Sequence, residues 1–192
     1  MNLDVVINLD VVLIPGLTAK VGDPIKTQKE TVMTNEELFL AVALNGWKGN
    51  IERADKMFFG LSEEDLLKEV APGKNRLIYL WGHLTAVHDA MLPLLGFGRR
   101  RHPEFDVVFI SNPDKTQPSV PSVELVRSAW KEVNGKLFEG FAGFSAADWL
   151  KKHAAVSEED FLKEPLRNRL AILLSRTNHL AYHLGQTALR PK

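Results

Sequence analysis

The 192-residue sequence contains no cysteine. This absence excludes disulfide bonds, thiolate metal ligands and a cysteine nucleophile supplied by the chain itself. Any thiol chemistry would therefore need a thiol brought in from outside. A reaction with an external thiol fits this composition, and so does a protein that uses no thiol at all.

The chain also lacks an excess of charge of either sign, since 24 Lys and Arg residues balance 24 Asp and Glu residues. No global electrostatic field is then available to attract nucleic acid or an anionic membrane. The basic run at residues 99–102, Arg-Arg-Arg-His, is typical of a solvated loop or of a contact for an anionic cosubstrate. We therefore expect a small-molecule substrate, no nucleic-acid partner and no membrane partner.

Long apolar runs are missing too. The sequence has no stretch of about 18 uninterrupted apolar residues, which argues against a membrane-spanning helix. The apolar segment at residues 3–14 is interrupted by Asp4, Asn8 and Asp10, and no basic region precedes it. It therefore does not have the form of a signal peptide. Together these features predict a cytoplasmic protein.

The first 33 residues differ in composition from the rest. The motif Asn-Leu-Asp-Val-Val occurs at residues 2–6 and again at residues 8–12, before the turn signal Pro15-Gly16. The β-branched residues favour extended structure. We predict an extended N-terminal arm over residues 1–33. The remaining length suits one folded domain, over residues 34–190.

Four long segments carry apolar residues at alternating spacings of three and four, the pattern of an amphipathic helix. The first begins at a capping box formed by Thr34 and Glu37, and the third follows Ser122, a good N-cap residue. Gly46 and Gly49 in the first segment suggest either a break in the helix or a close approach by another group. The four predicted helices cover about residues 34–58, 77–95, 123–141 and 166–184.

These helices predict an all-α fold, a four-helix bundle. A connection of roughly 25 residues separates the second helix from the third, too long for a simple hairpin loop. It could be a crossover that lets these two helices run parallel. Residues 105–110, Phe-Asp-Val-Val-Phe-Ile, resemble a strand that could pair with the N-terminal arm.

His179 and His183 stand four residues apart in the last predicted helix. This spacing places both imidazoles on one helical face, a turn apart, where they could bind one metal ion. With six histidines in the chain, chance alone gives about 0.2 such pairs, so the spacing by itself is weak evidence. Both residues project roughly 120° away from the leucine seam, which leaves a metal site and two solvated surface histidines as the alternatives.

A third ligand is expected on the second helix. His83 lies roughly 90° off the apolar stripe of that helix, whereas His88 falls within the stripe and points about 140° away from His83. One straight helix cannot direct both at one ion, so His83 is the candidate ligand. His88 is expected to be a core histidine or a residue that supports the ligands without binding the ion. His102 and His153 are expected to be solvated.

Three histidines on facing helices would form a metal site with one open position, as in catalytic zinc sites. Imidazole binds several transition metals, so the residues do not select one. Gln186 lies one turn beyond His183 on the same flank. It is suitably placed to hold a bound water or to orient a ligand.

The chain resembles the DinB/YfiT-like superfamily. The resemblance covers residues 34–190 and is carried by Leu-Trp-Gly-His, which ends at His83, and by His-x-x-x-His-Leu-Gly-Gln, which starts at His179. It implies a four-helix bundle, often a homodimer, that binds a divalent metal ion (Zn, Ni, Fe or Mn) through His83, His179 and His183. Some members of the superfamily are S-transferases or isomerases that use a low-molecular-weight thiol.

The leading hypothesis is a metal-dependent transferase that activates an external thiol against a small electrophile. A metal-dependent hydrolase is an alternative, for which Asp89 is the nearest carboxylate in sequence, although it points roughly 120° away from His83. A non-catalytic metal-binding or stress-response module is the third possibility. A fourth protein ligand would favour this last one, because structural metal sites are normally closed by four protein ligands.

Overall fold

The computed structural model describes residues 33–190. Within this range the regular structure is helical, without a β-strand. The predicted all-α fold is therefore confirmed for these residues, whereas the extended arm expected over residues 1–33 falls almost wholly outside them. None of the helices in the range has the length and apolar character needed to cross a membrane.

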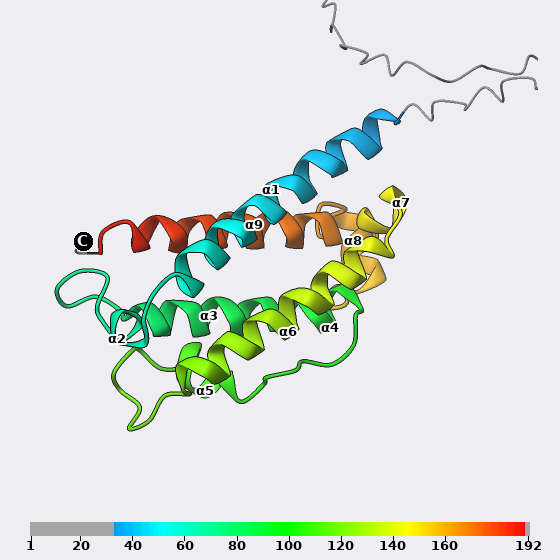
Figure 1. Cartoon of the computed structure of the whole chain (residues 1–192). Coiled ribbons are helices and arrows are strands. Elements are labelled where there is room, and N and C mark those ends of the chain that lie inside the picture. The colour runs from blue at the N-terminus through cyan, green and yellow to red at the C-terminus, as the bar shows by residue number, and fades with distance from the viewer. Residues whose placement is uncertain (1–32, 191–192) are drawn as a thin grey trace, which may run out of the picture. The chain divides into compact units, whose positions relative to one another are not determined.

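Four long helices make up most of the described chain: α1 (Asn35–Phe59), α3 (Leu77–Asp89), α6 (Val123–Ala142) and α9 (Arg169–Thr187). α3 packs mainly on α6, α1 packs mainly on α9, and α3 also contacts α9. α3 and α6 run in the same direction, opposite to α1 and α9 (Figure 1). The long connection between α3 and α6 is thus a crossover.

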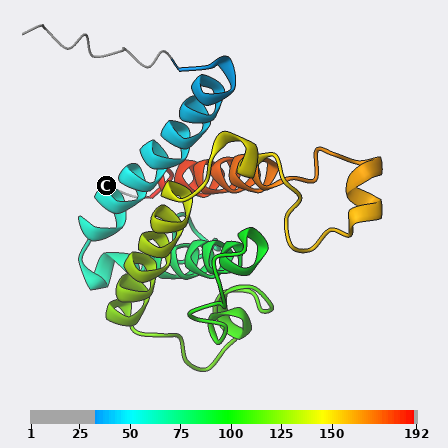
Figure 2. The same ribbon diagram turned by 90° about the vertical axis from the view of Figure 1, so that its right-hand side faces the viewer.

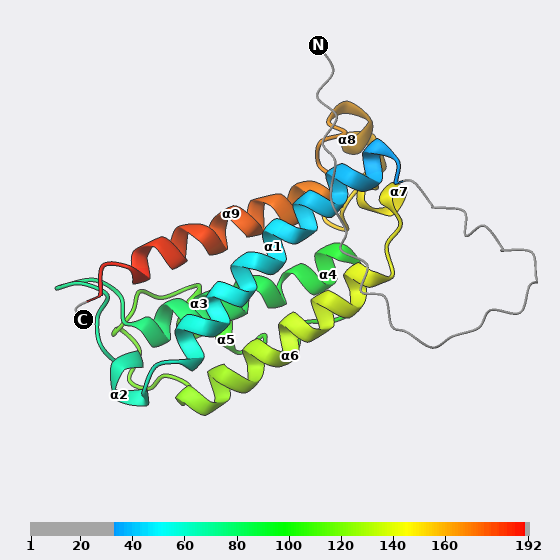
Figure 3. The same ribbon diagram turned by 45° about the horizontal axis from the view of Figure 1, so that its top comes forward.

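Short helices occupy the connections: α2 (Glu63–Leu66), α4 (Met91–Leu95), α5 (Phe105–Phe109), α7 (Ala146–Trp149) and α8 (Glu158–Lys163). α4 ends at Gly96, whose φ of 82° is the left-handed conformation that commonly terminates helices. α7 packs against α1 and α9 (Figure 3). The segment containing α8, drawn in orange, projects to the side of the long helices (Figure 2).

The first long helix begins where its capping box predicts. The Thr34 side chain accepts a hydrogen bond from the Glu37 amide at 3.2 Å, and the Glu37 carboxylate accepts one from the Thr34 amide at 2.8 Å. Gly46 and Gly49 lie inside this continuous helix with open space beside them. The suggested helix break is therefore wrong, and no group among residues 33–190 makes the suggested close approach. α1 tolerates the lower helix propensity of these two glycines because its second half is packed against the rest of the molecule.

The last long helix begins later than predicted, at Arg169 instead of residue 166. The Asn168 side chain accepts a hydrogen bond from the Ala171 amide at 2.9 Å and so caps the helix. Leu166 precedes the cap and is 81% exposed, so it is not part of the buried seam. The regular spacing of Leu166 with later leucines extended the predicted pattern beyond the true start.

The strand expected at residues 105–110 is instead the short helix α5. Phe105 and Phe109 are one helical turn apart, both fully buried, and their ring centroids are 5.3 Å apart. α5 packs on α3. The strand prediction is therefore wrong, because burial of two rings spaced for a helix overrides the strand preference of the intervening valines, and the N-terminal arm proposed as its partner lies outside the described residues.

Polar contacts fasten the crossover to α3. Asp114 accepts hydrogen bonds from the Arg76 guanidinium and the Arg76 amide, at 2.6 and 2.7 Å, and Tyr79 donates its hydroxyl hydrogen to the Asn112 carbonyl at 2.7 Å. Arg100 pairs with Asp89 and Asp106. The connection is therefore attached along the length of α3, where the candidate ligand His83 lies.

Candidate metal centre

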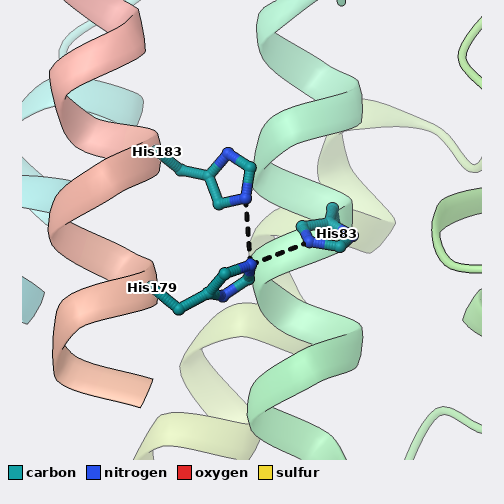
Figure 4. Close-up of side chains that lie close together, drawn as sticks. All are labelled: His83, His179 and His183. Carbon is teal, nitrogen blue, oxygen red and sulfur yellow. Dashed lines mark hydrogen bonds between the residues drawn. The ribbon is translucent and has the colours of Figure 1, made fainter. Parts of the chain in front are cut away.

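His83, His179 and His183 meet between α3 and α9 (Figure 4). The Nε2 atom of His179 lies 3.2 Å from Nε2 of His83 and 3.0 Å from Nε2 of His183. The ligand atoms of all three rings lie within 4.8 Å of one another. The structure thus brings together the three histidines singled out from the sequence, and all three are partly buried.

The two helices place these rings through their buried seams. Leu173 and Leu180 are fully buried on α9, and their packing turns the flank with His179 and His183 toward α3. On α3, Leu80 and Leu84 are buried to either side of His83. The amphipathic pattern of each helix therefore determines which flank faces the other.

Phe109 determines the tautomer of His83. The Nδ1 atom of His83 lies 2.8 Å from the backbone carbonyl oxygen of Phe109, which can only accept a hydrogen bond. Nδ1 must therefore carry the hydrogen, so in the neutral ring Nε2 has its lone pair free. That lone pair faces His179 (Figure 4).

Gln186 does the same for His183. The Nδ1 atom of His183 lies 2.8 Å from Oε1 of Gln186, while the Gln186 amide nitrogen donates to the Tyr182 hydroxyl at 3.1 Å. With the oxygen accepting from Nδ1–H, the lone pair of His183 Nε2 also points toward His179. Gln186, predicted to hold water or orient a ligand, thus contacts one of the three histidines directly.

The donor set fits a divalent cation. Two Nε2 lone pairs converge on His179, whose own Nε2–H could be donated to only one of them at full strength. Nitrogen atoms bound to one tetrahedral metal at about 2.0–2.1 Å lie about 3.3–3.4 Å apart, close to the 3.0 and 3.2 Å found here. The Nδ1 atom of His179 is buried and has no hydrogen-bond partner among residues 33–190.

The environment favours the neutral form of His179 and His183. Burial, reinforced by the neighbouring His183 and His83, lowers the pKa of His179 to about 4. Burial also lowers the pKa of His183, opposed by its hydrogen bond to Gln186. Metal binding requires neutral imidazole, so the protein holds both rings in the form that a cation needs at neutral pH.

His88 takes no part in this cluster, in agreement with its prediction as a core histidine. It is fully buried, its Nδ1 lies 2.9 Å from the side-chain oxygen of Asn134, and its ring packs between Trp47 and Trp130. Asn134 in turn donates to the Trp130 carbonyl at 2.9 Å, which orients its oxygen toward His88. Burial lowers the pKa of His88 to about 3.

Asp89, the carboxylate considered for a hydrolase, is fully buried and fully engaged. It accepts hydrogen bonds from the amides of Arg101 and His102, at 2.7 and 3.0 Å, and from the Arg100 side chain at 3.1 Å. Its role is to anchor the start of the crossover. In the basic run at residues 99–102, Arg101 is likewise paired with a carboxylate, since its guanidinium lies 2.7 Å from Glu132.

His102 is not the solvated side chain that its loop position suggested. Only 14% of the side chain is exposed, and its ring nitrogens each lie 3.2 Å from a carboxylate oxygen, one of Glu104 and one of Glu132. His153 is also partly buried rather than fully solvated. Neither lies in the three-histidine cluster.

Fold and site together define a helical protein with three histidines gathered on two facing helices. The sequence model of the DinB superfamily matches residues 47–187, which is well over half of the chain. The protein therefore belongs to the DinB superfamily. A search of the curated proteins found no match.

Two contacts at this site are not predicted from the sequence: the Phe109 carbonyl with His83, and Tyr182 with Gln186. The Phe109 carbonyl is a backbone group, so no residue type marks it, and its segment was interpreted as a strand. Tyr182 lies next to His183 in sequence, but its hydrogen bond to Gln186 depends on side-chain orientation. The i, i+4 spacing of Tyr182 and Gln186 was the available signal for the second contact.

Proposed function

We propose that the protein binds one divalent metal ion through His83, His179 and His183 and acts as a metal-dependent transferase. The observation that carries the proposal is the convergence of three Nε2 atoms, two of them with lone pairs directed by fixed hydrogen bonds. Zn, Ni, Fe and Mn are all candidates, because imidazole ligands alone do not select among them.

The proposed reaction joins an external low-molecular-weight thiol to a small electrophile. A metal held by the three imidazoles of His83, His179 and His183 would retain its positive charge and would lower the pKa of a bound thiol or water. A sulfur–carbon bond forms, the leaving group departs with its electron pair, and the thiol proton passes to solvent. The chain contributes the neutral ligands and, through Phe109 and Gln186, their orientation.

A hollow lined by residues of α3, α9 and the segment before α3 supports a small-molecule substrate, although the three histidines are not among its lining residues. It has a volume of about 250 Å³ and adjoins Gln186, which also holds His183. Lys74 and Asn75 provide polar groups along its wall, and Leu80 and Leu189 provide apolar surface. Such a mixture suits a compact molecule with one polar end. We propose that this hollow receives part of the thiol or the electrophile.

The metal proposal is tested by purifying the protein without chelator and measuring bound metal by mass spectrometry and affinity by calorimetry. We expect one ion per chain in the wild type and more than about 100-fold weaker binding in His83→Ala and His179→Ala. Loss of a ligand should cost more than loss of a residue that only hydrogen-bonds to a ligand, for which about 10- to 100-fold is typical. His153→Ala is the matched control and retains the ion. Equal affinities in all four proteins would refute the site.

The transferase proposal is tested with the metal-loaded protein, a panel of small thiols and a chromogenic electrophile. Activity should depend on both metal and thiol and disappear in His179→Ala. A rate with water but without thiol would favour a hydrolase. No rate above the metal-free control for any thiol, combined with tight metal binding, would favour a non-catalytic module.

We also propose that the protein forms a homodimer. Leu38, Phe39 and Val42 in the first half of α1 are 53%, 76% and 65% exposed, an apolar surface that a second copy could cover. Sedimentation analysis of the wild type and of Phe39→Ser tests this. A monomeric wild type at micromolar concentration would contradict it.

A further inference from the structure

Three successive residues of α3 face three different neighbours. The Trp81 ring stacks on Phe58 of α1, with centroids 4.9 Å apart, and His83 faces His179 of α9. Between them, Gly82 faces α5: a methyl group on its Cα would overlap the ring of Phe109. Only a residue without a side chain lets that ring come so close to the backbone of α3.

The ring and the carbonyl of Phe109 act on adjacent residues. The ring is fully buried against Gly82, while the backbone carbonyl of the same residue accepts the Nδ1–H of His83 at 2.8 Å. The distance between the α3 and α5 backbones therefore determines whether this hydrogen bond can form. A ring displaced by even a methyl group would carry the carbonyl away from His83.

We propose that α5 is a positioning element for His83. The packing of Phe109 on Gly82 sets the Phe109 carbonyl where it fixes the Nδ1–H tautomer and turns Nε2 toward α9. The effect of this device on metal affinity rests on the proposed metal site, whereas its effect on the His83 ring does not. The crossover is thus part of the site, although it supplies none of the three histidines.

The remaining contacts of the crossover hold α5 in place. The Arg100–Asp106 pair fastens its first turn, and the Tyr79 hydroxyl bonds to the Asn112 carbonyl just beyond its end. The Tyr79 ring also lies nearly parallel to His83, at 8° with centroids 6.5 Å apart. The His83 ring is therefore held by a hydrogen bond and flanked by an aromatic ring, both of which depend on this arrangement.

Gly82→Ala tests the inference, and the chain offers a matched control. Gly140 on α6 contacts the ring of Phe97 in the same way, and a methyl group there would overlap that ring. Gly140→Ala should therefore disturb a comparable packing contact away from the histidines. Gly135→Ala, with open space beside it, controls for the substitution itself.

Metal affinity measured by calorimetry is the first readout. We expect Gly82→Ala to weaken binding about 10- to 100-fold, the usual effect of losing a partner that orients a ligand. Gly140→Ala and Gly135→Ala should bind like the wild type, even if Gly140→Ala unfolds at lower denaturant concentration. Equal affinities for Gly82→Ala and Gly140→Ala would overturn the inference.

The tautomer of His83 in the metal-free protein is the second readout. Ring ¹⁵N chemical shifts should report Nδ1–H in the wild type and in Gly140→Ala, and a mixture of tautomers in Gly82→Ala. An Nε2–H tautomer of His83 in the wild type would overturn the inference even if Gly82→Ala fails to fold. If the wild type binds no metal, the proposed function fails, and the tautomer measurement alone decides whether α5 positions His83.

Discussion

His83 and His88 lie five residues apart on α3, but their surroundings differ in kind. In both rings Nδ1 meets an oxygen, the Phe109 carbonyl for His83 and the Asn134 side chain for His88. The difference is at Nε2. The Nε2 atom of His83 faces the two imidazoles of α9. The Nε2 atom of His88 is enclosed among residues such as Trp47 and Trp130 and has no hydrogen-bond partner among the described residues.

This comparison separates a candidate ligand from a core histidine. An oxygen acceptor at Nδ1 fixes the tautomer in either case, so the first contact alone does not identify a metal site. A ligand also needs other donors around its free lone pair. His88 instead packs between two tryptophans, and the free-energy cost of burying its polar ring is offset by this packing and by one hydrogen bond.

Removal of the core histidine should have the largest effect on folding. His88→Ala leaves a cavity between two tryptophans and an unpaired Asn134 oxygen, so we expect a loss of about 2–4 kcal/mol in the free energy of unfolding. Chemical denaturation measures the loss. The affinity for metal per folded molecule should change less than threefold. A large loss of affinity would show that His88 supports the ligands and would weaken the distinction between the two residues.

The second-largest expected effect is the loss of stability of the metal-free protein in acid, which should differ between the fully buried His88 and the partly exposed His179. The lowered pKa values of His179 and His88, about 4 and about 3, mean that the unfolded chain binds protons near pH 6.5 while the folded metal-free chain does not. This contribution to stability is complete above pH 6.5 and is lost as the pH falls toward the folded-state values. Each buried histidine adds a slope of at most about 1.4 kcal/mol per pH unit.

Denaturation of the metal-free protein between pH 7 and pH 5 measures this slope, before most carboxylates titrate. His88→Ala removes one contribution, so the stability difference between wild type and variant should shrink as the pH falls. His179, which is partly exposed, contributes less than the fully buried His88. A difference that stays constant over this range would contradict the neutral, buried state of His88.

The smallest expected effect concerns Gln186. Gln186→Leu removes the acceptor for His183 Nδ1–H while keeping a side chain of similar size, so we expect about tenfold weaker metal binding, or about 1.4 kcal/mol. Calorimetry at pH 7.5 measures it. Asn134→Leu, which removes the corresponding acceptor of His88, should leave the affinity unchanged. Similar losses of metal affinity in both variants would mean that the surroundings of His88 affect the metal ligands as much as those of His183 do.

Helical periodicity accounts for most of what could be predicted about the site. The phase of each helix placed His179 and His183 off the seam, chose His83 over His88 as their partner, and put Gln186 on the same flank. The capping box of Thr34 and Glu37 and the Ser122 cap also located the starts of α1 and α6, because a cap depends on residues three apart in sequence. Spacing failed at Leu166, where an exposed leucine continued the pattern beyond the cap.

The sequence by itself determined the all-α class and the long helices, since each depends on contacts within a few residues, and helical phase together with the family resemblance singled out the three histidines. Only the tertiary structure decided that residues 105–109 form a helix, that the ring of Phe109 rests on Gly82, and that its carbonyl orients His83. These contacts join segments 26 or more residues apart through a backbone group and a missing side chain. No local pattern encodes such a pairing, because it forms only when the crossover folds back onto α3.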